Sequence, residues 1–149
     1  MILPPIAELI PHTAPMILLD RVISASPEQL TAEVTIRPDS PFCDGQRVGG
    51  WVGIEYMAQT IAALAGWTAR QKNDPVRLGF LVGTRQYRSQ TPWFQVGDIL
   101  HVSVHREIDG DNGVSAVVCH INSPEGLLHA AATITVFQPD NLEEFLKTS

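Results

Sequence analysis

Polar and apolar residues alternate along several segments of this chain. Between residues 30 and 36, apolar side chains occupy every second position and polar side chains stand between them. A period of two is typical of a β-strand with one buried face. Further strands are predicted over residues 16–24, 76–88, 99–108, 114–121 and 127–137.

The inner and outer rows of these strands can be assigned from the same alternation. Leu100, Val102 and Val104 are predicted to face inward, as is the row that runs from Leu128 to Val136. Three histidines occupy the polar rows of their strands, and we expect them to be solvated: His101, His105 and His129.

One segment has a different pattern. Residues 48–69 carry a single formal charge, that of Glu55, and predict one long helix from about Trp51 to about Lys72, which Pro75 cannot continue. A membrane span of about 20 residues would be more uniformly apolar. Polar residues such as Gln59 interrupt this segment, and a lone carboxylate is costly in hydrocarbon. We therefore expect a helix that is buried in protein.

The order of elements predicts the architecture. Two strands, one apolar helix and four further strands indicate an α+β fold in which an antiparallel sheet wraps around one long central helix, the hot-dog fold. Residues 38–50 are predicted to form a loop, residues 5–10 a short helical turn and residues 141–147 a tail helix. The edge strands and the exposed flank of the helix favour a dimer.

Composition narrows the class of protein. The 149 residues predict a single domain over residues 1–149. A net charge of −6 argues against a nucleic-acid binder. Cys43 and Cys119 form no CxxC pair, and the first residues lack a basic region before the apolar ones, so we expect no signal peptide and a cytoplasmic location.

Glu55 is the main candidate for chemistry. A carboxyl group in an apolar helix is costly unless it is paired, hydrogen-bonded or protonated, and burial would favour the neutral acid that can donate a proton. The helix N-terminus favours the anion instead. The alternative is a first-turn glutamate that caps the helix and faces water. Gly49 and Gly50 precede the helix, where free N–H groups can bind an oxyanion, or where they can simply form an entry turn.

Other candidates carry weaker signals. His12 can transfer a proton near neutral pH, or it can be a packing or surface residue of the N-terminal segment. No HxH or HExxH spacing occurs, so no metal site is expected. Cys43 has no histidine nearby in the sequence and is more typical of a buried thiol than of a nucleophile.

Several blocks together resemble one enzyme family. The chain contains the blocks LIPHTAPMILLDRV (residues 9–22), IEYMAQ (54–59), GFLVG (79–83), Pro92 and GDIL (97–100). These blocks are similar to LPHRxPFLLVDRV, IEAMAQ and GFLxG…P…PGD in the 3-hydroxyacyl-[acyl carrier protein] dehydratases. The blocks follow the family's order. The resemblance implies removal of water from a 3-hydroxyacyl thioester to give the trans-2-enoyl thioester, without a cofactor and at a site shared by two subunits.

The resemblance also implies roles for single residues. Glu55 matches the helix acid that protonates the departing hydroxyl, and Gly50 approximates the glycine whose N–H holds the thioester carbonyl. With these, Gln46, Gly49 and Gln59 are expected to contact the substrate.

One departure from the family affects the base. Gln46 stands where the family has the histidine that removes the C2 proton, and an amide cannot act as a general base. Three alternatives follow: His12 supplies the base, the protein is an acyl thioesterase, or it is a catalytically silent subunit that pairs with an active paralogue. The loop resembles that of dehydratase-like proteins of aryl polyene pathways, and either a homodimer or a heterodimer is expected.

The partner is expected to be an acyl carrier protein or coenzyme A thioester. Carrier proteins are acidic, so docking needs a basic surface. Half of the ten Lys and Arg residues fall within a short stretch that either forms such a surface or is an ordinary charged helix end: Arg70, Lys72, Arg77, Arg85 and Arg88.

Overall fold

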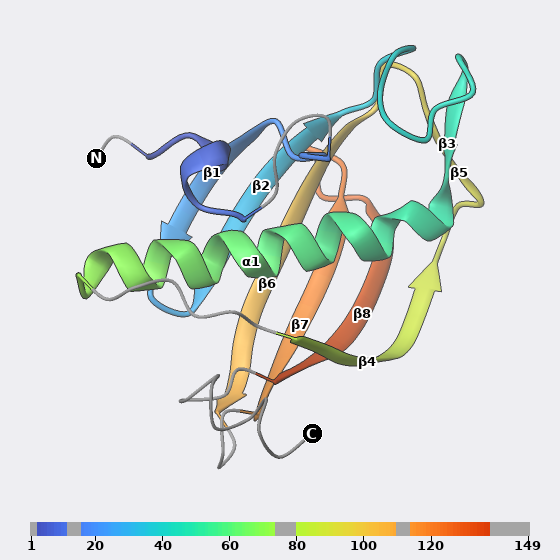
Figure 1. The fold of residues 1–149 in the computed structure, drawn as a ribbon. Helices are drawn as coiled ribbons and strands as arrows, with labels where there is room; N and C mark the ends of the chain where they lie inside the picture. The colour runs from blue at the N-terminus through green and yellow to red at the C-terminus, as the bar shows by residue number, and fades with distance from the viewer. Residues whose placement is uncertain (1–2, 12–15, 74–79, 110–113, 138–149) are drawn as a thin grey trace.

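The computed structural model describes residues 3–11, 16–73, 80–109 and 114–137 (Figure 1). These residues form two short 3-10 helices, one α-helix and eight strands, joined by turns and loops. Their bounds are η1 Ile6–Glu8, β1 Arg21–Ser26, β2 Gln29–Thr35, β3 Arg47–Gly49, η2 Gly50–Val52, α1 Gly53–Gln71, β4 Phe80–Ser89, β5 Trp93–Gln95, β6 Ile99–Asp109, β7 Val114–Asn122 and β8 Leu128–Phe137.

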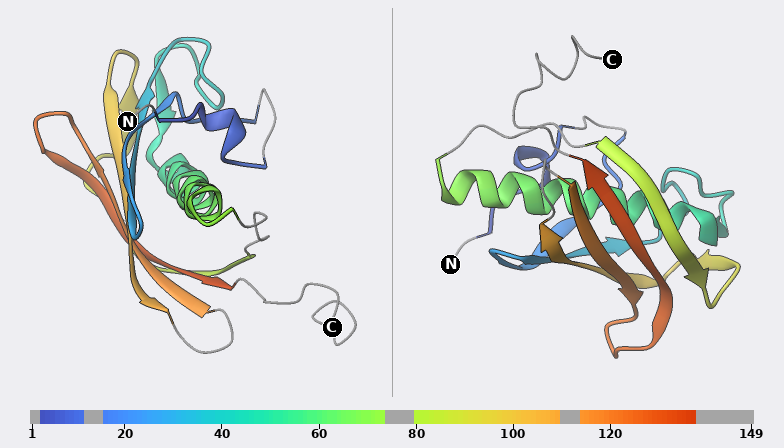
Figure 2. Two further views of the ribbon diagram at one scale, coloured as in Figure 1. Left: turned by 90° about the vertical axis from the view of Figure 1, so that its left-hand side faces the viewer. Right: turned by 90° about the horizontal axis from the view of Figure 1, so that it is seen from below.

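Six strands form one sheet in the order β1-β2-β6-β7-β8-β4, and every neighbouring pair is antiparallel. The sheet curves around α1, which lies across its concave face (Figures 1 and 2). This arrangement confirms the predicted antiparallel sheet around one central helix. None of the described helices combines the length and the apolar character that a bilayer crossing requires.

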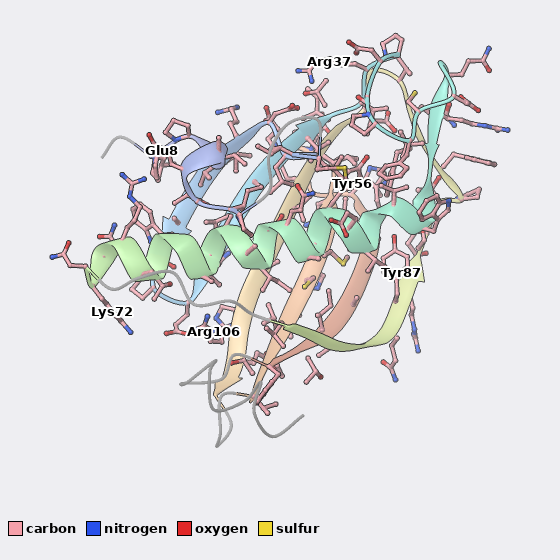
Figure 3. All side chains as sticks on the ribbon, viewed as in Figure 1. Glu8, Arg37, Tyr56, Lys72, Tyr87 and Arg106 are labelled. Carbon is pink, nitrogen blue, oxygen red and sulfur yellow. The ribbon has the colours of Figure 1, made fainter. Side chains whose placement is uncertain are left out.

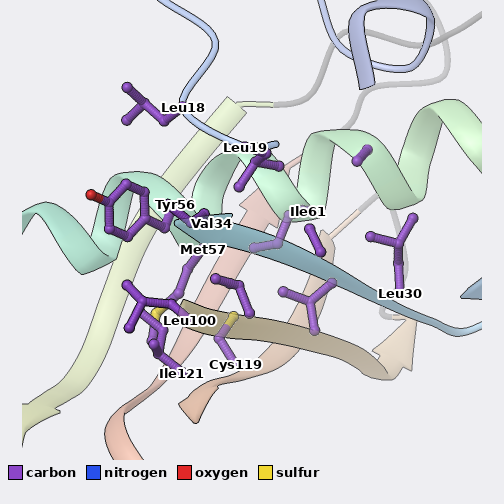
Figure 4. Packing of buried hydrophobic residues seen from close by; sticks show 14 of the residues in the cluster. Leu18, Leu19, Leu30, Val34, Tyr56, Met57, Ile61, Leu100, Cys119 and Ile121 are labelled. Carbon is purple, nitrogen blue, oxygen red and sulfur yellow. The ribbon is translucent and has the colours of Figure 1, made fainter. Parts of the chain in front are cut away.

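The predicted inner rows form the core between sheet and helix. Leu30 is paired with Val104 and Ala32 with Val102, and all four residues are fully buried. On the helix, Met57 is buried against this surface (Figure 4), and Leu64 is buried as well. The rows meet because side chains two apart on a strand share one face of the sheet.

The N-terminal turn covers the other side of the helix. Leu9 and Ile10 are buried, and the carbonyl of Leu9 lies so close to Gly66 that a Cβ at this position would collide with it. Glu8 adds an ion pair with Arg70, 2.9 Å between Oε2 and Nη1. The short helical turn predicted for this segment is confirmed as η1.

One stripe of the helix is only half-buried. Glu55, Ala58, Ala62 and Ala65 recur every three or four residues and are partly exposed, as is Ile54, whereas the residues between Glu55, Ala58, Ala62 and Ala65 are buried. The sheet and the N-terminal turn thus leave one long flank of α1 uncovered within the described part of the chain.

Some sequence expectations need correction. The first strand begins at Arg21 rather than residue 16, because residues 16–18 are hydrogen-bonded to α1 instead of a neighbouring strand. The predicted 38–50 loop contains β3, which pairs with the unpredicted β5. Leu128, expected inside, is 38% exposed at the first position of its strand. The tail helix predicted for residues 141–147 lies outside the described residues.

The histidines of the sheet also differ from one another. His105 is exposed, as predicted. His101 is instead half-buried, with its Nε2 3.1 Å from the carboxylate of Glu33, and the His129 ring packs edge-on against Phe94. The polar row therefore includes a histidine–carboxylate contact and an aromatic contact that alternation alone does not reveal.

Candidate active site

Glu55 lies in the first turn of α1, on the half-buried stripe of the helix. Its Oε1 accepts a hydrogen bond of 3.2 Å from Nε2 of Gln59, one turn further along. Glu55 is therefore neither a fully buried acid nor a freely solvated one. It is a partly exposed carboxyl group that a neighbouring amide holds in place.

Gln59 is itself fixed on every side. It is fully buried, its Oε1 accepts the N–H of Leu18 at 2.9 Å, and its Nε2 donates to the carbonyl of Met16 at 2.8 Å. Both amide hydrogens are then used, one on Met16 and one on Glu55. We expected Gln59 to contact substrate. The structure instead places it as the group that orients Glu55 and anchors the segment after residue 15 to the helix.

Gly50 is engaged by the protein backbone. Its N–H donates to the carbonyl of Pro92 at 2.8 Å, so the expectation of a free N–H at this glycine is wrong. A Cβ on Gly50 would lie 2.7 Å from the carbonyl oxygen of Thr91. The glycine is needed because the turn after β4 packs directly on the start of the helix. Gly49 ends β3 opposite Trp93.

Tyr87 also contacts the helix start, and the sequence did not single it out. Its hydroxyl donates to the carbonyl of Gly50 and occupies the space that a Cβ on Gly53 would fill (Figure 3). The β4–β8 register shifts beside it, and Gln86 has a φ of 55°. A β-bulge re-aims side chains, and such an irregularity cannot be read from alternation.

Gln46 projects from the loop before β3. Its side chain is exposed and makes no hydrogen bond to the described residues, whereas its N–H donates to the carboxylate of Asp44 at 2.9 Å. Backbone N–H groups of Gln46 and Arg47 lower the pKa of Asp44. The loop is thus fixed through its backbone, and the Gln46 side chain faces away from the protein core.

Exposed aromatic rings gather next to this loop. Phe42 and Trp51 are 55% and 67% exposed and pack edge to face, with ring centroids 5.8 Å apart. The Arg47 guanidinium lies 3.8 Å from the ring centroid of Trp93. Large apolar side chains in such a group are typical of a surface that another protein covers.

The remaining predicted residues do not form one site. His12 and Arg77 lie outside the described residues, and so does the side chain of Arg85. Arg70 lies in the last turn of α1, and Lys72 directly follows the helix. Arg88 follows Tyr87, which bonds to Gly50 at the other end, and the 19 residues of α1 span about 28 Å. Among the described residues, Arg70 and Lys72 therefore do not share a surface with Arg88, and a docking surface around the five basic residues stays a prediction. In the described part of the chain, no group of three metal-ligating side chains occurs.

Comparisons with known proteins agree on one relationship. The family model described as "ApeP-like: ApeP dehydratase" matches residues 4–147. The 3-hydroxyacyl-[acyl-carrier-protein] dehydratase FabZ of Ralstonia nicotianae is 32% identical over 114 residues, which are 70% of this chain and 68% of that protein.

Solved structures extend the comparison. A chain of the dehydratase heterocomplex ApeI:P from Xenorhabdus doucetiae matches with a TM-score of 0.86 and 29% identity, over 98% of this chain and 97% of that one. A hypothetical thioesterase of Streptococcus pneumoniae matches with a TM-score of 0.63 and 12% identity, over 79% of this chain and 84% of that one. The second match shows a shared fold alone.

Proposed function

The chain belongs to the ApeP-like dehydratase family, and from this we propose that it removes water from a 3-hydroxyacyl thioester with Glu55 as the acid. It is a hydro-lyase with the hot-dog fold. The resemblance seen in the sequence, including that to dehydratase-like proteins of aryl polyene pathways, is thereby confirmed.

The held carboxyl group of Glu55 carries the proposal. Dehydration needs an acid that gives its proton to the C3 hydroxyl as the C–O bond breaks. Gln59 fixes one oxygen of Glu55 through a hydrogen bond of 3.2 Å, and the partly exposed position leaves room for a substrate to approach. An acid held in one orientation avoids reorganisation during the reaction.

The second proton transfer needs a base. Removal of the C2 proton supplies the electron pair of the new C2–C3 double bond, while the hydroxyl leaves as water with the proton from Glu55. We propose His12 for this step. His12 precedes Met16 by four residues in the sequence, and the carbonyl of Met16 accepts a hydrogen bond from Gln59, the residue that holds Glu55.

A second subunit completes the site in this proposal. The half-buried stripe of α1 contains Glu55, and the exposed rings of Phe42 and Trp51 lie just before the start of the helix. Exposed apolar surface of this kind is typical of a contact with another protein subunit. The similarity to a chain of the ApeI:P heterocomplex favours a paralogue as the partner, with a homodimer as the alternative.

The substrate in this proposal is carried by an acyl carrier protein, as in the name of the FabZ relative. The thioester has to reach Glu55 at the start of α1. Arg88 is exposed at that end of the helix, whereas Arg70 lies at the other end and is paired with Glu8. Docking near Arg88 therefore fits better, in a cytoplasmic setting where carrier-bound acyl chains are made.

The test compares the wild type with Glu55→Gln, each alone and with the paralogue, on a 3-hydroxyacyl carrier thioester. The rate of enoyl thioester formation, monitored by ultraviolet absorbance, should be at least about 1,000-fold lower in the variant because the amide has no acidic proton. Glu28→Gln, in the exposed β1–β2 turn, is the matched control. Normal turnover by Glu55→Gln would refute the proposal.

The base is tested separately. His12→Ala should abolish dehydration while the subunits remain assembled and folded, as judged by sedimentation and circular dichroism. Full activity in His12→Ala would assign the base to the other subunit. Release of free thiol without enoyl formation would instead indicate a thioesterase, and carrier binding without turnover would indicate a silent subunit.

A further inference from the structure

A small polar cavity lies beside the first turns of α1. It has a volume of about 190 Å³ and lies between the helix, the end of β2 and the loop after it. Its lining combines an apolar wall with hydroxyl and charged groups: Ile17, Leu18, Asp20, Val34, Thr35, Arg37, Asp39, Ser40, Pro41 and Tyr56. None of the roles proposed above uses this cavity.

Tyr56 is the most informative residue of the cavity. It is 2% exposed, and its hydroxyl has no hydrogen-bond partner among the described residues, although it lines the cavity. Figure 4 shows the hydroxyl pointing away from Leu100 and Ile121 in the core. Buried tyrosine hydroxyls usually find a partner. This one is aimed into open space instead.

The position also departs from the family pattern. The block IEAMAQ has alanine where this chain has Tyr56, so the phenol is an addition to the helix at this point. Burial raises the pKa of Tyr56, which keeps the hydroxyl protonated at physiological pH. Tyr56 is therefore available as a hydrogen-bond donor.

The other polar groups define what the cavity can accept. Both carboxylate oxygens of Asp20 are used, one by the N–H of Thr35 at 2.6 Å and one by the Arg37 guanidinium at 3.2 Å. Ser40 accepts the N–H of Arg37 at 2.8 Å, so its own hydroxyl hydrogen points elsewhere. Asp39 also lines the cavity, so its lining contains two carboxylates and one guanidinium, and this charge balance disfavours an anionic ligand.

The cavity is linked to the proposed catalytic group through shared neighbours. Leu18 lines the cavity, and its N–H is bonded to Gln59, which holds Glu55. Tyr56 follows Glu55 directly in the helix. A thioester bound at Glu55 can therefore place a neighbouring part of the same molecule against the cavity.

We propose that this cavity binds an uncharged oxygen acceptor of the thioester substrate, with the hydroxyls of Tyr56 and Ser40 as donors. The inference rests on the proposed dehydratase function. The acceptor can come from two sources, namely a carbonyl or hydroxyl in the pantoyl part of the pantetheine arm, which N-acetylcysteamine lacks, or an oxygen near the far end of the acyl chain.

The test measures kcat/KM for wild type and Tyr56→Phe with four 3-hydroxyacyl thioesters, in the oligomer that supports turnover. A short acyl chain is offered on pantetheine and on N-acetylcysteamine, and a longer chain on pantetheine with and without a terminal hydroxyl. Loss of one neutral hydrogen bond should reduce kcat/KM about 3- to 10-fold. The reduction should be confined to the substrates that carry the recognised oxygen, and Ser40→Ala should show the same selectivity.

The pattern of losses identifies the source. If kcat/KM falls in Tyr56→Phe for both pantetheine thioesters without a terminal hydroxyl, but not for the N-acetylcysteamine thioester, the recognised oxygen belongs to the pantetheine arm. If kcat/KM falls only for the chain with the terminal hydroxyl, the recognised oxygen belongs to the acyl end. An equal reduction of kcat/KM for all four substrates, or no reduction for any, would overturn the cavity proposal. The proposed dehydratase function would still be supported in that case if the short chain is dehydrated.

A binding measurement separates the two proposals. Unreactive thioether analogues of the same four compounds, titrated by calorimetry, should show the same selective loss in Tyr56→Phe even if the chain does not turn over thioesters. Identical affinities of wild type and variant for every analogue would sink the cavity proposal independently of catalysis.

Discussion

Replacement of Gln59 by methionine tests the link between folding and the site. Methionine is close to glutamine in volume, so the change removes hydrogen bonds and leaves packing nearly intact. The N–H of buried Leu18 loses its acceptor, at a cost of about 1–3 kcal/mol. The carbonyl of Met16, a residue that is 54% exposed, can turn to water and adds about 1 kcal/mol.

The expected loss of stability is therefore about 2–4 kcal/mol, or about 4–16 °C in melting temperature for a domain of this size. Glu55 also loses its orienting donor, so kcat should fall by a further 10- to 100-fold or so at a temperature where both proteins are folded. Thermal unfolding by circular dichroism and enoyl formation are the two measurements.

Gln71→Met, at the exposed last residue of the same helix, is the matched control and should leave both quantities unchanged. An unchanged melting temperature in Gln59→Met would show that the buried amide is not the anchor described above. A stability loss with an unchanged kcat would separate Gln59 from the orientation of Glu55.

Two further changes test parts of the fold. Hydrogen bonds from Arg21 lower the pKa of Glu33 below its usual 4.5. The carboxylate therefore stabilises the fold above pH 4.5, and this contribution is lost as the pH falls. Glu33→Gln should lower the free energy of unfolding by at most about 1 kcal/mol at neutral pH and by nothing in acid, as measured by urea unfolding at several pH values. Gly53→Ala should destabilise by about 1–3 kcal/mol because its Cβ meets the hydroxyl of Tyr87, and adding Tyr87→Phe should recover part of that loss by the same assay.

The sequence predicts the parts of this fold that depend on local periodicity. Leu30, Ala32 and Val34 alternate because one face of β2 is buried, and the apolar helix is covered because the sheet curves around it. Strands β3 and β5 escaped prediction because each has only three residues. Periodicity needs a longer window to be distinguished from loop composition.

The site could be predicted only in part, for a related reason. Glu55 is visible as the lone charge in an apolar segment. The role of Gln59 depends on Leu18 and Met16, which are 41 and 43 residues away in the chain. Likewise, the N–H of Gly50 is occupied by Pro92. Such partners are set by tertiary contacts, which spacing along the chain does not encode.

The two halves of the proposed chemistry are supported unequally by this chain. The acid half is complete, since Glu55 is retained and Gln59 holds it through groups of the same chain. The base half lacks the histidine of the family pattern, and Gln46 is an exposed amide that cannot accept a proton. A subunit that keeps one half of a shared site gains most from a non-identical partner, because a second copy would repeat the same deficiency unless His12 corrects it. The His12→Ala experiment therefore decides whether this chain or its partner supplies the base.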